Sequence, residues 1–114
     1  MMSLASGDVV WTPYPYVETN RLRSRPALIL ASGLGVDAEL CWALMITNAA
    51  RPEWPGDVPI IDHETYGLPI PSKIRTEKIA TLETVRANWL GRLDPATLER
   101  VRAAIARHLG NLSR

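Results

Sequence analysis

The amino-acid sequence predicts a mainly β protein, built as a small, curled antiparallel sheet or partial barrel with one amphipathic helix near its C-terminus. Short segments rich in β-branched and aromatic residues follow one another from residue 7 to residue 82, separated by polar loops that contain proline and glycine. Beyond residue 94 the apolar residues instead recur at helical spacing. A length of 114 residues suits one domain, 1–114, with a single core.

Strands are expected wherever a short apolar run lies between turn-forming residues. The first, over residues 7–14, ends among Pro13 and Pro15, which cannot donate hydrogen bonds to a neighbouring strand. The segment 14–25 is expected to be a loop, because it combines proline, asparagine and several arginines. Further strands are expected over 26–32, 39–47, 58–62 and 72–82, the last long or bent, with turns or irregular loops over 33–35, 48–57 and 63–71.

The expected helix begins after Asp94, whose side chain can cap it, and Pro95 suits the first helical position. Gly110 is expected to end it. One face, which should pack on the sheet, carries apolar residues at helical spacing: Leu98, Val101, Ile105 and Leu109.

The charge balance excludes a protein coated with basic residues for nucleic-acid binding. Lys and Arg number 13 against 12 Asp and Glu, for a formal net charge of +1. Any anion site must therefore come from local clustering of cations. The longest apolar run, residues 40–46, is far shorter than the ~18 residues of a membrane span, and the start lacks a secretory pattern, so a cytoplasmic location is expected. Cys41, the only cysteine, lies in this run and is expected to be a buried, inert thiol.

A first basic cluster stands at the entrance to the strand over 26–32. Arg21, Arg23 and Arg25 occupy alternate positions, and side chains two residues apart in an extended segment point the same way. Their guanidinium groups repel one another unless acids or an anionic ligand neutralise them, and planar forks at this density suit phosphate oxygens. The alternative is a solvated loop whose arginines pair with Glu18 and other surface acids.

A second charged cluster alternates with apolar residues over 71–83 and includes Ser72, Lys73, Arg75 and Glu77. Arg75 and Glu77 share one face of the expected strand. Beside a phosphate, an arginine stabilises charge and a carboxylate can act as the general base for attack by a hydroxyl. The alternative is an ion pair along one strand or between strands.

Other side chains have both a structural and a functional interpretation. Thr47 and Asn48 end the strand over 39–47, where they could hydrogen-bond a ligand or start a turn. Trp54 either packs beneath its proline-rich loop or offers a ring for base stacking. His63 has an acid on each side, which indicates a metal site only weakly, because adjacent strand positions point to opposite faces. No zinc spacing or glycine-rich phosphate loop is present in the sequence, so no metal or cofactor is expected.

From about Gly7 to Leu109, the ordered segments resemble the PemK and MazF family, the toxin halves of bacterial type II toxin–antitoxin pairs. The resemblance rests on GDVVW, RSRPALIL, ALMITN, GLPIPSKIR, IATLE and WLGRL, followed by a closing helix. It implies an SH3-like barrel with an added helix, a homodimer, an antitoxin partner that is partly disordered when free, and metal-independent, sequence-selective cleavage of single-stranded RNA. In such an mRNA interferase the 2′-hydroxyl attacks the neighbouring phosphate, which leaves a 2′,3′-cyclic phosphate and a 5′-hydroxyl.

Carried over residue by residue, the family's motifs assign Arg25 and Thr47 to the scissile phosphate. Arg75 would stabilise charge and Glu77, one methylene longer than the family's aspartate, would accept the 2′-hydroxyl proton. The remaining candidates for RNA binding are Arg21, Arg23, Asn48, Trp54, Ser72 and Lys73. The resemblance leaves open which RNA sequence and which class of cellular RNA is cut.

Two alternatives to the nuclease are an inactive or purely RNA-binding relative and a CcdB-like toxin. CcdB-type toxins share the barrel-and-helix architecture, yet they poison DNA gyrase by protein contact and cleave nothing, so fold alone does not decide function. They act through a helix end with a Trp-Gly-Ile terminus, whereas this chain ends Gly-Asn-Leu-Ser-Arg. The two charged clusters favour the nuclease.

Overall fold

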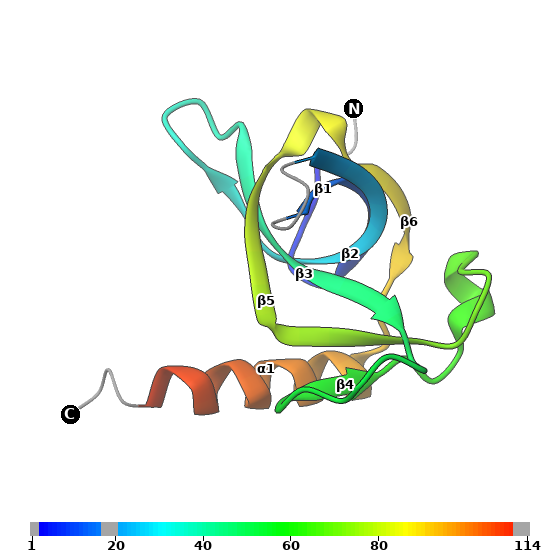
Figure 1. Cartoon of the computed structure of the whole chain (residues 1–114). Helices are drawn as coiled ribbons and strands as arrows, with labels where there is room; N and C mark the ends of the chain where they lie inside the picture. The colour runs from blue at the N-terminus through cyan, green and yellow to red at the C-terminus, as the bar shows by residue number, and fades with distance from the viewer. Residues whose placement is uncertain (1–2, 17–20, 111–114) are drawn as a thin grey trace.

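The computed structural model describes residues 3–16 and 21–110, without the side chains of residues 16, 21 and 22. Its strands form one antiparallel, 6-stranded sheet in the order β4-β5-β3-β2-β1-β6, which curls around an apolar interior (Figure 1). The predicted antiparallel sheet with one C-terminal helix is confirmed. The sheet is not closed, because β4 and β6 are its two edges, so it is a barrel only in a loose sense.

The strands confirm most of the expected elements. Their bounds are β1 (Asp8–Tyr16), β2 (Arg21–Leu34), β3 (Leu40–Asn48), β4 (Asp57–Pro59), β5 (Ser72–Glu83) and β6 (Asn88–Arg92). Short 3-10 helices, η1 (His63–Tyr66) and η2 (Thr84–Arg86), and the helix α1 (Pro95–Leu109) complete the described chain. The sequence analysis did not predict β6, a short edge strand whose pattern is too brief to stand out.

The loop expected over residues 14–25 is wrong at both ends. β1 continues to Tyr16 and β2 already begins at Arg21, so the two strands form a long hairpin in which Pro13 pairs with Ser24. Prolines are tolerated here because β1 pairs with β6 only as far as Trp11, and beyond that point it has β2 as its one described neighbour. The arginine-rich segment is therefore part of the sheet.

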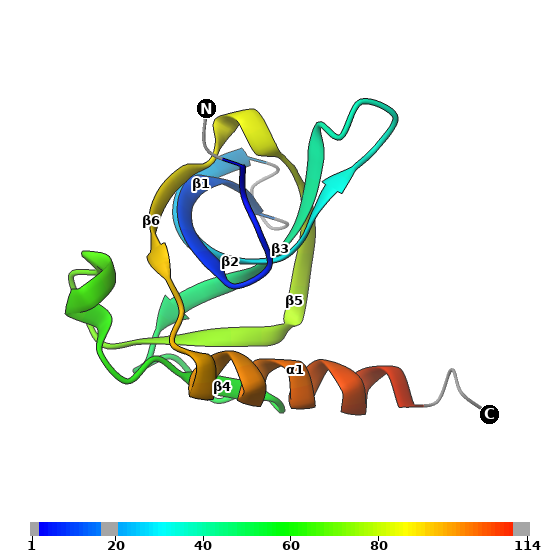
Figure 2. The ribbon, with the colours of Figure 1, turned by 180° about the vertical axis from the view of Figure 1, so that it is seen from behind.

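The sheet curls through irregular pairings. In β5, Ile79 pairs with Leu44 of β3 and Arg75 pairs with Met45, so the residues between them bulge out and bend the strand. Figure 2 shows the two halves of β5 running in different directions, one along the curl and one above α1. The expectation of one long or bent strand is confirmed.

Two apolar clusters fill the molecule, one inside the curl and one between the sheet and α1. The inner cluster includes Tyr14, Ile29, Met45 and Cys41. Cys41 is fully buried, as predicted, and this burial raises the pKa of its thiol. The other is formed largely by these residues: Val9, Leu28, Leu44, Ile46, Ile74, Leu98 and Val101.

The helix α1 begins as predicted. The Asp94 carboxylate accepts a hydrogen bond from the Thr97 N–H at 2.9 Å, which lowers the pKa of Asp94, and Pro95 is the first helical residue. The helix ends at Leu109, where Gly110 keeps a right-handed conformation. Leu109 is 52% exposed, so the last turn extends beyond the packed face. In the part of the chain that the structure describes, no helix is long and apolar enough to cross a membrane.

Candidate functional site

A cleft of about 340 Å³ opens where β1, β2 and β3 meet the chain segment that enters β5. Its polar lining residues are Arg23, Ser24, Arg25, Thr47, Asn48, Arg51 and Ser72. The other lining residues are largely apolar and include Trp11, Leu68, Pro69 and Ile70. Of the predicted site residues, the cleft brings together Arg23, Arg25, Thr47, Asn48 and Ser72.

The arginines of β2 reach the cleft because the strand is extended. Arg25 pairs with Thr12 of β1 and Arg23 pairs with Tyr14, so both lie on the hairpin at alternate positions, as the sequence predicted. The side chain of Arg21 lies outside the described residues, as does Glu18. Burial lowers the pKa of the Arg25 guanidinium, and the positive charge of Arg51 lowers it further. Positive charge is therefore concentrated at this end of the cleft.

Small polar side chains line the cleft at the end of β3. Asn48 pairs with Ser72 of β5 in the sheet register, and Thr47 and Ser72 are buried. The Asn48 side-chain oxygen accepts a hydrogen bond from the Ala50 N–H at 2.9 Å, so Asn48 also starts the turn that follows. Ser72 donates its hydroxyl to the Ile70 carbonyl at 2.9 Å. The strand ends thus place hydroxyl and amide groups beside the arginines.

Two residues of the cleft were missed by the sequence analysis. Arg51 returns to the end of β3 because its N–H donates to the Asn48 carbonyl at 3.0 Å, which closes a tight turn. A basic residue just after a strand-ending Thr-Asn pair could have indicated this position. Trp11 lies 40% exposed at the cleft. Its exposure was hidden in the sequence, because an aromatic residue in a strand usually indicates core packing.

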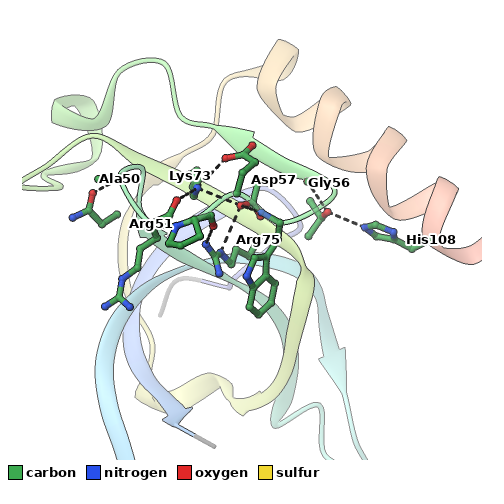
Figure 3. A network of polar contacts seen from close by, with 12 residues as sticks. Ala50, Arg51, Gly56, Asp57, Lys73, Arg75 and His108 are labelled. Atoms are coloured by element: carbon green, nitrogen blue, oxygen red, sulfur yellow. Dashed lines mark hydrogen bonds and ion pairs between the residues drawn. The ribbon is translucent and has the colours of Figure 1, made fainter. Parts of the chain in front are cut away.

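Lys73 and Arg75 lie in a different environment, a buried charge cluster around Asp57 (Figure 3). Only 3% of Lys73 and 7% of Arg75 is exposed, and both side chains approach the buried carboxylate of Asp57. Lys73 also forms an ion pair with the exposed Glu53 at 2.9 Å. Neither basic residue is among those that line the cleft.

Trp54 and Glu77 also lie away from the cleft. Trp54 is 37% exposed, but the Arg75 guanidinium sits over its ring, 4.2 Å from the ring centre, so one stacking face is occupied. Glu77 lines a separate, largely apolar groove of about 690 Å³ between β5 and α1, where its carboxylate is 4.0 Å from the His108 Nδ1. Within one chain the structure therefore separates Glu77 from Arg25.

No group of three or more metal-ligating side chains gathers within residues 3–16 and 21–110. His63 belongs to η1, where Leu68 donates its N–H to the His63 carbonyl at 3.1 Å. The described chemistry of the cleft is thus that of arginines, hydroxyl groups and an aromatic ring.

Comparison with known families identifies the chain. The sequence profile of the family described as "PemK-like, MazF-like toxin of type II toxin-antitoxin system" matches residues 5–109. The chain therefore belongs to the PemK-like and MazF-like toxins of type II toxin–antitoxin systems. No curated protein sequence matches it significantly.

Solved structures share the fold at low sequence identity. MazF from Deinococcus radiodurans superposes with a TM-score of 0.74 at 22% identity, over 96% of this chain and 99% of that chain. An endoribonuclease in complex with its cognate antitoxin, from Mycobacterial species, gives a TM-score of 0.68 at 22% identity, over 95% and 96%. The Mycobacterium tuberculosis toxin MazF-mt6 gives 0.68 at 19% identity, over 90% and 96%. The similarity extends over nearly the whole of each protein.

Proposed function

We propose that this toxin is a metal-independent endoribonuclease, an mRNA interferase that cleaves single-stranded RNA in the cleft beside Arg25. The proposal rests on the clustering of arginines in one cleft. In a chain with a net charge of only +1, Arg23, Arg25 and Arg51 line one small cleft. The family and its solved relatives, one of which is an endoribonuclease with its antitoxin, support the same function.

The scissile phosphate is expected to bind between Arg25 and Arg51. The positive charge of Arg51 lowers the pKa of Arg25, so these cations repel each other in the unliganded cleft. A phosphate between them replaces this repulsion with charge-assisted hydrogen bonds, for which the guanidinium fork is well suited. Thr47, which lines the same cleft, would donate its hydroxyl to a phosphate oxygen.

The same arrangement would stabilise the transition state of RNA cleavage. The 2′-oxygen forms a bond to phosphorus while the bond between phosphorus and the 5′-oxygen breaks. A general base accepts the proton of the 2′-hydroxyl, and a general acid or water donates a proton to the leaving 5′-oxygen. Negative charge on the phosphorane oxygens increases during this step, and Arg25, fixed on β2, is placed to stabilise it. Losing one such group costs roughly a hundredfold or more in rate.

The proton acceptor for the 2′-hydroxyl has to be a group other than the described cleft residues. The described residues of the cleft include no carboxylate or imidazole. A guanidinium stays protonated near neutral pH, so Arg25 is assigned an electrostatic role and not that of the proton acceptor. The roles that the family resemblance gives to Arg75 and Glu77 stay predictions, and both side chains lie outside this cleft in one chain.

The apolar side of the cleft would hold a base. Trp11 presents a half-exposed ring next to the arginines, and single-stranded RNA is commonly bound by stacking its bases on aromatic rings. A nucleotide could then place its phosphate against Arg25 and Arg51 and its base against Trp11. Trp54, with a guanidinium over its ring, is the weaker candidate for stacking.

The partners follow from the family. We expect a homodimer, a cytoplasmic location, and inhibition by a cognate antitoxin whose acidic or apolar segment covers the arginine-lined cleft. Solved structures of MazE-MazF from Deinococcus radiodurans support an antitoxin partner. Single-stranded RNA is the proposed substrate, no membrane is involved, and residues 1–114 act as one toxin domain.

The direct test incubates the purified protein and an Arg25→Ala variant with a long single-stranded RNA in the presence of EDTA. We expect discrete cuts with 2′,3′-cyclic phosphate ends, slowed at least a hundredfold in the variant. RNA left intact by the folded wild-type protein would refute the nuclease. Trapping of gyrase on DNA by that protein would then establish the CcdB-like alternative.

A further inference from the structure

We infer that the buried cluster of Asp57, Lys73 and Arg75 positions Arg51 in the cleft, so that Lys73 and Arg75 are positioning residues of the anion site. The inference rests on the proposed function where it names RNA as the anion. It gives the second basic segment of the sequence a role other than direct contact with substrate.

The cluster is centred on Asp57, whose side chain is fully buried at the start of β4. Its Oδ2 lies 3.5 Å from the Lys73 Nζ and 3.6 Å from the Arg75 Nε, and it accepts a hydrogen bond from the Trp54 N–H at 3.0 Å. Among the described atoms, Asp57 Oδ1 and Arg75 Nε have no hydrogen-bond partner. The cluster is therefore incompletely satisfied, and burying it is costly.

The same cations hold the loop that carries Arg51. The Lys73 ammonium donates to the Arg51 carbonyl at 2.6 Å, and the Arg75 guanidinium donates to the Pro52 carbonyl at 2.5 Å. Residues 48–55 are exposed, so few apolar contacts could fix this loop. Figure 3 shows the Arg51 carbonyl facing Lys73 while its guanidinium points away from the cluster. The hydrogen bond from Lys73 thus fixes the backbone of Arg51, whose side chain lines the cleft.

The far end of the loop is fastened to the same strand. Thr76 donates its hydroxyl to the Gly56 carbonyl at 2.7 Å, and the His108 Nε2 lies 2.9 Å from that hydroxyl. Gly56 has a φ of +80°, and a side chain there would collide with Thr76. The loop is therefore tied to β5 at Arg51, Pro52 and Gly56.

Two physical arguments connect this fastening to the anion site. Burying apolar residues at these positions of β5 would cost less desolvation energy than burying Lys73 and Arg75. Unlike apolar residues, the two cations donate hydrogen bonds to the loop carbonyls of Arg51 and Pro52. In addition, the positive charges of Arg51 and Arg25 repel each other. An exposed loop without restraints would move Arg51 away from Arg25. Fixing the Arg51 carbonyl keeps both guanidiniums at one phosphate.

A double-mutant cycle tests the inference. Wild type, Lys73→Met, Arg51→Ala and the double variant are compared for kcat/KM on single-stranded RNA, with the folded fraction checked by thermal unfolding. We expect a loss on the order of a hundredfold for Arg51→Ala and tenfold or more for Lys73→Met. The double variant should cleave no more slowly than Arg51→Ala, because Lys73 acts through Arg51.

Glu53→Gln is the matched control, since it removes only the exposed partner of Lys73 and should change cleavage less than twofold. Losses that multiply in the double variant, or wild-type cleavage by folded Lys73→Met, would overturn the inference. Should Lys73→Met fail to fold, Lys73→Arg keeps the charge but moves the donor, and the cycle is repeated with it under the same criteria.

A second readout separates this inference from the proposed nuclease activity. The same cycle is measured as affinity for a single-stranded DNA oligonucleotide, which lacks the 2′-hydroxyl. A wild-type protein that leaves RNA intact refutes the nuclease, while non-additive losses of DNA affinity would still support positioning of Arg51 by Lys73. Additive losses of DNA affinity in an active nuclease would refute the positioning alone.

Discussion

Residues 21–25 and 73–75 carry basic side chains at alternate positions, and the fold gives the two segments different environments. Arg23 and Arg25 on β2 line an open cleft, whereas Lys73 and Arg75 on β5 are buried against Asp57. The neighbours explain the difference. β2 borders the cleft along its hairpin with β1, while β5 is covered by β4 and the loop before it. Arg23 and Arg25 therefore face the cleft, whereas Lys73 and Arg75 are buried away from it.

The largest effect is expected on the stability of the buried cluster. Asp57→Ala leaves Lys73 and Arg75 without their central carboxylate and should lower the free energy of unfolding by about 3–5 kcal/mol. Urea denaturation measures this loss. Glu53→Gln removes an exposed carboxylate from the same lysine and should cost less than about 1 kcal/mol. Equal losses in Asp57→Ala and Glu53→Gln would show that the buried carboxylate contributes no more to stability than the exposed one.

Substitution of an arginine in the cleft should change the rate of RNA cleavage. Arg25→Lys keeps the charge but loses the planar fork, so we expect RNA cleavage to fall about tenfold or more, in line with about 1.5–3 kcal/mol for a charged hydrogen bond. Single-turnover kinetics with saturating RNA measure this change. The free energy of unfolding should stay within about 0.5 kcal/mol of wild type. Unchanged cleavage would mean that Arg25 acts only as a point charge.

The apolar side of the cleft provides the next comparison. Trp11→Ala removes the proposed stacking surface and should weaken binding of a non-cleavable single-stranded RNA by about 1–3 kcal/mol. The matched control is Trp42→Ala, because Trp42 is also exposed but lines the groove beside α1. Equal weakening in both variants would place RNA outside the cleft or across both surfaces.

The smallest effect is expected for Glu77. Its carboxylate lines the groove beside α1, near His108, so Glu77→Gln should lower single-turnover cleavage by less than about tenfold, the scale below which general-base loss is not indicated. A loss of a hundredfold or more would restore the base role that the family resemblance assigns to it. It would also require that the groove and the cleft cooperate, for example in a homodimer.

Sequence patterns sufficed for the features that depend on local chemistry. Asp94 and Pro95 mark the start of α1, and alternate spacing placed Arg23 and Arg25 on one side of an extended segment. The hairpin of β1 and β2 was missed, because prolines normally interrupt a strand and only the position of β6 shows that they lie beside an open edge.

The fate of each charged side chain could not be predicted from spacing. Arg25 and Arg75 each follow a basic residue two positions earlier, but Arg75 is buried against Asp57, which comes from another strand. Arg51 reaches the cleft through a turn and through hydrogen bonds with β5. Such contacts between distant segments decide which cations face a ligand, and periodicity carries no information on them.

The salt dependence of RNA affinity tests the central claim, that the cleft arginines bind phosphate. A non-cleavable single-stranded RNA is titrated into wild type, Arg25→Ala, Arg51→Ala and Arg102→Ala, the last an exposed arginine on α1. Our account predicts that the slope of log affinity against log salt decreases by roughly 0.7 in each cleft variant and is unchanged in Arg102→Ala. A wild-type slope in Arg25→Ala would contradict it.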